Sequence, residues 1–128
     1  MDKMLIIDDD KMNCKLLQKS LINHGRCDVA HDGVEALQLF FAQQQKNDPY
    51  AVIFLDINMP NLDGPNTLKL IRSYENAFQI TNYAKICILT ADSDKKKAMD
   101  LFKEGCEDHL IKPYTNESVQ TILKKYSN

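Results

Sequence analysis

Four short segments of this chain carry side chains that could do chemistry together. They hold three adjacent aspartates, an isolated aspartate, a threonine and a lysine: Asp8-Asp9-Asp10, Asp56, Thr90 and Lys112. Crowded carboxylates repel one another unless a cation intervenes, and an open carboxylate cluster that keeps water ligands suits Mg²⁺. A dication, an ammonium and a hydroxyl together hold a transferring phosphoryl group, whose charge spreads over three oxygens. A remaining carboxylate could then act as the nucleophile and form an acyl phosphate.

Each of these residues alone has an ordinary structural explanation. Asp10 fits the N-cap of a helix, Pro113 fits the end of a strand, and a single strand-end threonine or lysine means little. These separate structural explanations do not account for the fact that all of the residues fall at one edge of the expected sheet. We therefore favour the functional interpretation.

The elements that must position these residues alternate between strands and helices. Apolar β-rich runs predict strands at residues 4–8, 27–31, 51–56, 86–90 and 109–112. Helical periodicity predicts helices at about residues 11–24, 33–46, 65–75, 94–104 and 116–126. The segment 73–85 either extends the third helix or forms a long loop.

Five such alternations imply parallel strands joined by right-handed crossovers. The third and fourth strands are apolar on both faces, as in sheets that helices cover on two sides. We expect an α/β fold: a five-stranded parallel doubly wound sheet of flavodoxin-like strand order 2-1-3-4-5. Ligands bind beyond the carboxyl ends of the strands in such sheets, where the acids, the threonine and the lysine fall.

Capping signals mark several of these boundaries. Polar residues are placed to begin the second, fourth and fifth helices, and glycines follow the first and fourth. Asp32 with Glu35 would begin the second helix, Ser93 the fourth and Thr115 the fifth. Gly25 would follow the first helix and Gly105 the fourth.

Composition narrows the function classes. The 128 residues, 44% hydrophobic and 27% charged, fit one globular domain, and no apolar run reaches the roughly 18–20 residues that cross a bilayer. A net charge of −2 argues against a direct nucleic-acid partner. Four cysteines without metal-ligand spacing fit reduced thiols and a cytoplasmic location.

The motifs at the strand ends resemble those of the receiver domain of two-component response regulators, over essentially the whole chain. Each motif is weak alone, but four in the right order at compatible spacing are highly specific. They are Leu5-Ile6-Ile7-Asp8-Asp9-Asp10, Leu55-Asp56-Ile57-Asn58-Met59-Pro60 with Asp63-Gly64, Leu89-Thr90-Ala91, and Lys112-Pro113-Tyr114.

The resemblance implies a role for each matching residue. Asp56 is the phosphoacceptor, which takes a phosphoryl group from a histidine of a sensor kinase or a phosphotransfer protein. Asp8 and Asp9 position Mg²⁺ together with Asp56 and the backbone carbonyl of Asn58. Such a domain catalyses only its own phosphorylation and dephosphorylation and is otherwise not an enzyme.

The resemblance also implies a switch. Thr90 moves toward the phosphoryl group and Lys112 pairs with its oxygens, and the bond between Lys112 and Pro113 is cis. An aromatic residue that swings inward with the threonine is replaced here by His109, for which a switching role and a passive one are equally open. Asn58 and Asp92 occupy positions that tune the phosphoryl lifetime.

The chain is expected to be a single receiver domain, residues 1–128, without an output domain. Phosphorylation would then shift a population toward an active arrangement that a downstream protein reads. The surface implied for this contact is formed by the fourth helix, fifth strand and fifth helix.

Other function classes remain as alternatives. A haloacid dehalogenase-like Mg²⁺-dependent phosphatase would use Asp8 as its nucleophile, but that leaves the segment 56–60 unexplained. A receiver-fold adaptor would never take a phosphoryl group. Flavodoxin shares the expected fold, but three aspartates after the first strand would repel a flavin phosphate.

Overall fold

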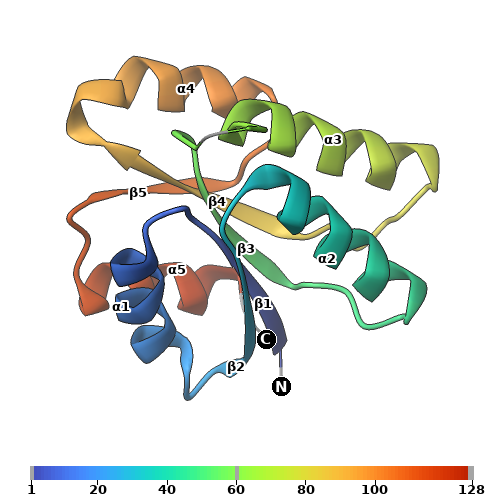
Figure 1. Ribbon diagram of the computed structural model, residues 1–128, viewed down its shortest axis with the longest axis horizontal. Helices are drawn as coiled ribbons and strands as arrows, with labels where there is room; N and C mark the ends of the chain where they lie inside the picture. The colour runs from blue at the N-terminus through green and yellow to red at the C-terminus, as the bar shows by residue number, and fades with distance from the viewer. Residues whose placement is uncertain (1, 60, 127–128) are drawn as a thin grey trace.

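A parallel five-stranded sheet forms the centre of the molecule (Figure 1). The computed structural model describes residues 2–59 and 61–126, so Pro60 of the acceptor motif lies outside the described residues. The strand order is β2-β1-β3-β4-β5, which confirms the predicted flavodoxin-like topology. The strands are β1 (Asp2–Ile7), β2 (Gly25–Ala30), β3 (Val52–Asp56), β4 (Lys85–Ala91) and β5 (Asp108–Lys112).

Helices cover both faces of the sheet (Figure 1). Residues of α2, α3 and α4 pack in one core cluster and those of α1 and α5 in the other. Side chains alternate along β3, so that Ile53 and Leu55 enter the first cluster while Val52 and Phe54 enter the second. The helices are α1 (Lys11–Leu21), α2 (Gly33–Gln45), α3 (Gly64–Ala77), α4 (Lys95–Lys103) and α5 (Asn116–Tyr126), with a 3₁₀ turn η1 (Asp92–Asp94) before α4.

Several predicted helix boundaries are confirmed by their caps. The Asp10 side chain accepts from the backbone N–H groups of residues 12 and 13, and the Asp32 side chain accepts from the Glu35 N–H. Thr115 and Ser118 exchange side-chain to backbone hydrogen bonds at the start of α5. Gly105 follows α4 with φ +108°, in the left-handed region that favours glycine.

Three boundary predictions needed correction or resolution. The first helix ends at Leu21, and Gly25 begins β2, where a Cβ atom would lie 1.8 Å from the Asp2 carbonyl oxygen. The close approach of β1 and β2, rather than a helix cap, explains why a glycine occupies position 25. Ser93 lies inside η1, and α4 begins after Asp94. The third helix continues to Ala77, so the extension is real, and the loop to β4 covers residues 78–84.

Within the described residues, no helix is long and apolar enough to span a membrane.

Candidate functional site

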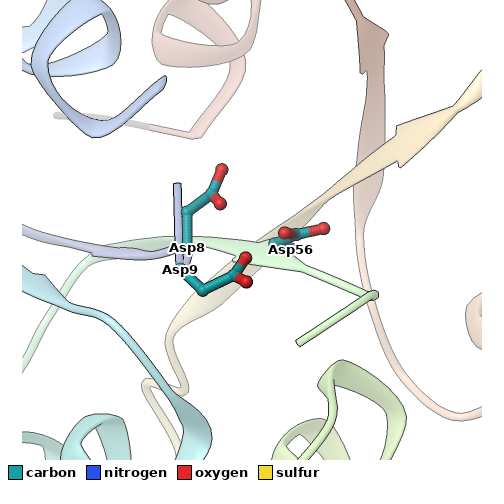
Figure 2. Close-up of side chains that lie close together, drawn as sticks. All are labelled: Asp8, Asp9 and Asp56. Carbon is teal, nitrogen blue, oxygen red and sulfur yellow. The ribbon is translucent and has the colours of Figure 1, made fainter. Parts of the chain in front are cut away.

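The polar residues of the predicted site meet at the carboxyl edge of the sheet. Strands β1 and β3 are paired in parallel with Ile7 opposite Leu55, so the residues that follow, Asp8 and Asp56, come out at the same edge. Figure 2 shows the side chains of Asp8, Asp9 and Asp56 gathered there. The last residue of β5, Lys112, reaches the same place.

Three carboxylates and one ammonium form the centre of the site. Asp8, Asp9 and Asp56 each offer one oxygen, and these oxygens all lie within 4.8 Å of one another. Asp8 and Asp56 are buried, whereas Asp9 is exposed. The Lys112 Nζ atom lies 3.3 Å from an oxygen of Asp8 and 3.3 Å from an oxygen of Asp56. Because the cluster holds three carboxylates and Lys112 pairs with only two of them, it keeps an excess of negative charge that a dication would neutralise.

The Asp8 carboxylate shows that the cluster fits a metal ion. Its Oδ1 accepts a hydrogen bond of 3.0 Å from the Asp10 backbone N–H. Its Oδ2 is buried and accepts no hydrogen bond, although the Lys112 ammonium lies 3.3 Å away. The ammonium therefore supplies charge but no aligned donor. Since a buried carboxylate oxygen that accepts no hydrogen bond is costly, Oδ2 is suited to bind a hard cation.

Electrostatics at the site keep Asp56 reactive and Lys112 charged. Burial raises the pKa of Asp56 to about 6, with a contribution from Asp8, while the Asn58 N–H and the Lys112 ammonium act in the opposite direction. Burial lowers the pKa of Lys112, but the Asp56 and Asp8 carboxylates outweigh it and leave this pKa above its usual value. At neutral pH Asp56 is therefore mostly ionised and Lys112 protonated.

The segment after β3 is held against the start of α3. The Asp63 side chain caps α3 by accepting from the Asn66 N–H at 2.9 Å. A Cβ atom on Gly64 would lie 2.5 Å from the Asp56 carbonyl oxygen and 2.4 Å from the Ile57 Cα. Only glycine permits this contact, which fixes the backbone that carries Asp56.

Asn58 connects the site to the start of α4. Its backbone N–H donates to Asp56 Oδ1 at 3.2 Å. Its side-chain Nδ2 donates to Asp94 at 2.8 Å, and its Oδ1 accepts from Lys97 at 3.3 Å. Sequence reasoning missed the contacts of Asp94 and Lys97 with Asn58, because they join residues 36 and 39 positions apart and no local pattern marks them.

The remaining predicted site residues lie on β4, η1 and β5. The Thr90 hydroxyl is buried and donates to the Ala91 carbonyl at 3.2 Å. Asp92 is exposed and pairs with Lys95 at 3.1 Å. The His109 ring packs edge-on against Phe102 with centroids 5.6 Å apart, and its buried Nδ1 has no hydrogen-bond partner. The roles assigned to these residues stay predictions.

The peptide bond between Lys112 and Pro113 is cis, as the resemblance implies.

Comparisons with known proteins agree with this arrangement. The profile of a family described as response regulator receiver domain matches residues 4–124. Hybrid signal transduction histidine kinase L of Dictyostelium discoideum is 34% identical over 97% of the chain, and the peroxide stress-activated histidine kinase mak2 of Schizosaccharomyces pombe is 32% identical over 95%. The chain spans only 7% and 5% of the lengths of these two relatives. The crystal structure of a two-component response regulator from Clostridium difficile superposes with a TM-score of 0.82 at 29% identity, over 98% of this chain and 94% of that one.

Proposed function

The chain belongs to the response regulator receiver domain family, and on that basis we propose that Asp56 accepts a phosphoryl group in a phosphorelay. The observation that carries the proposal is the position of Lys112, whose ammonium lies 3.3 Å from the Asp56 carboxylate inside the acidic cluster. A cation at this place can pair with the oxygens of an incoming phosphoryl group.

The nucleophile is assigned by comparing the carboxylates. Asp8 is fully buried, and one of its oxygens is already engaged by the Asp10 N–H. Such a phosphatase would also use Asp10, the second acid of an Asp8-x-Asp10 motif, but the Asp10 side chain is engaged in capping α1. Asp56 ends its strand with its Oδ2 oxygen 3.3 Å from the Lys112 ammonium, which also lies 3.3 Å from Asp8, and only its Oδ1 accepts from the Asn58 N–H. This comparison favours Asp56 over the alternative of a phosphatase that uses Asp8.

The transfer step is a displacement at phosphorus. An ionised oxygen of Asp56 forms a bond to the phosphorus, the bond from phosphorus to the donor's imidazole nitrogen breaks, and the electron pair stays on that nitrogen. Lys112 would exchange its contact with Asp56 for one with the phosphoryl oxygens. Because Asp56 has a pKa of about 6, the nucleophile is available at neutral pH without a general base.

The residues that would hold Mg²⁺ are Asp8, Asp9 and Asp56, with the backbone carbonyl of Asn58 as a further ligand. When bound, the ion supplies positive charge that offsets the carboxylates and the charge of the transferring group. The buried Oδ2 of Asp8, which accepts no hydrogen bond, and the three converging carboxylate oxygens support this assignment.

Phosphorylation of Asp56 would change the conformation of the face formed by α4, β5 and α5. We propose that Thr90 turns toward the phosphoryl group and that His109 changes its packing with it, so that phosphorylation shifts the population toward an active arrangement. Asn58 and Asp92 would tune the phosphoryl lifetime. The partners proposed are a histidine kinase or histidine phosphotransfer protein upstream and a protein that reads this face downstream.

Mass spectrometry of the intact protein tests the proposed function. Wild-type protein with Mg²⁺ and acetyl phosphate should gain one phosphoryl group, Asp56→Asn should gain none, and Asp100→Asn, an exposed control on α4, should behave as wild type. An adduct that persists in Asp56→Asn but is lost in Asp8→Asn would support the phosphatase alternative. No adduct on any variant, even with a histidine phosphotransfer protein as donor, would support a receiver-fold adaptor.

A further inference from the structure

The acidic turn after β1 is held in place by the neighbouring strand β2. The Asp8 backbone N–H donates to the Ala30 carbonyl at 3.0 Å. The Asp8 carbonyl oxygen lies 3.1 Å from Nδ1 of His31, the residue directly after β2, and 3.3 Å from the Cys14 sulfur. Both backbone polar groups of Asp8 are therefore held by residues outside β1 and the turn that follows it.

The contact with His31 defines where the imidazole carries its hydrogen. A carbonyl oxygen only accepts, so the 3.1 Å contact requires a hydrogen on Nδ1. Cys14 shares the same carbonyl, but a thiol is a weak donor, so His31 supplies the stronger bond. The imidazole is half-buried, which limits the competition from water for this donor.

We infer that His31 is a positioning residue for the metal-binding acids, an inference that rests on the proposed function. With its backbone held by His31 and its Oδ1 by the Asp10 N–H, Asp8 directs the remaining Oδ2 into the cluster. Asp9 follows in the same turn, so its carboxylate depends on the same anchor. Some groups hydrogen-bond a metal-binding residue without contacting the metal. Their removal typically weakens the protein's affinity for the metal by about 10–100-fold.

Three substitutions of His31 separate this role from simple packing. His31→Leu keeps bulk and removes the donor, and it should weaken Mg²⁺ binding about 10-fold, as measured by calorimetric titration. His31→Asn places an amide N–H near the position of Nδ1 and should restore most of the affinity. His31→Gln places its amide near the position of Nε2 and should restore little. His24→Leu, outside the site, is the matched control.

Phosphorylation from acetyl phosphate should show the same order. In His31→Leu the rate should fall about 10-fold at limiting Mg²⁺ and approach the wild-type rate at saturating Mg²⁺. Unchanged Mg²⁺ affinity in His31→Leu, or equal rescue by asparagine and glutamine, would overturn the inference.

An NMR measurement on the metal-free protein tests the contact between His31 and Asp8 independently of the proposed function. Long-range ¹H–¹⁵N NMR spectra of the metal-free protein at pH 8 should show a hydrogen on Nδ1 of His31, and His31→Leu should shift the amide signals of Asp9 and Asp10. A hydrogen on Nε2 alone would overturn the inference. If wild-type protein neither binds Mg²⁺ nor accepts a phosphoryl group, the proposed function fails, while these spectra still decide whether His31 holds the turn.

Discussion

Replacing Asp56 by asparagine is expected to stabilise the metal-free protein at neutral pH. The Asp56 carboxylate is buried beside Asp8, and its pKa is raised from 3.8 to about 6. Each tenfold change in an equilibrium constant corresponds to about 1.36 kcal/mol, so the ionised carboxylate opposes folding by up to about 3 kcal/mol. Asparagine removes the charge, and we expect a gain of about 1–3 kcal/mol in the free energy of unfolding.

The sign of the pH dependence follows from linkage. Between pH 4 and 6 the native protein keeps on Asp56 a proton that the unfolded chain has lost, so the stability of wild type falls as pH rises through this window. The advantage of Asp56→Asn should therefore be full above pH 6 and shrink toward pH 4. The exposed control Asp100→Asn should show no such change.

Urea unfolding in EDTA at several pH values from 4.5 to 7.5 measures both effects. Addition of Mg²⁺ should then stabilise wild type more than Asp56→Asn, since a ligand of the native state raises its stability by RT ln(1 + [L]/Kd). A variant less stable than wild type at pH 7.5, or an advantage that does not change with pH, would refute the electrostatic reasoning.

Three further outcomes are expected. Arg72→Ala should cost about 3–5 kcal/mol in urea unfolding, because it leaves the buried Glu75 without its 2.6 Å partner; a cost below 1 kcal/mol would contradict the importance of this ion pair. Gly64→Ala should destabilise the fold by about 1–3 kcal/mol through its clash with the Ile57 backbone, whereas unchanged stability would show that the contact relaxes freely. Since burial raises the pKa of all four thiols, to about 11 for Cys14, DTNB at pH 8 should label the native protein slowly and the urea-unfolded protein fast; rapid labelling of the native state would contradict this.

Much of the fold could be predicted from the sequence because its signals are local. Apolar runs and helical periodicity gave the alternation of five strands and five helices, and this alternation restricts the sheet to parallel strands. The cap of α1 by Asp10 needs only residues 12 and 13. The error at Gly25 arose because a glycine near a helix end fits both a cap and a close approach between strands, and only the neighbouring Asp2 carbonyl distinguishes them.

The sequence by itself also placed the acids, the threonine and the lysine at one edge, since the carboxyl ends of parallel strands point the same way. Only the tertiary structure shows which atoms come into contact at this edge of the sheet. Strand register and helix placement set the ion pair of Asp8 Oδ2 with Lys112, the contact of His31 with the Asp8 carbonyl and the hydrogen bond from Asn58 to Asp94. The His31 and Asn58 contacts join residues 23 and 36 positions apart, which is longer than any local sequence period, so they depend on the assembled sheet and its helices.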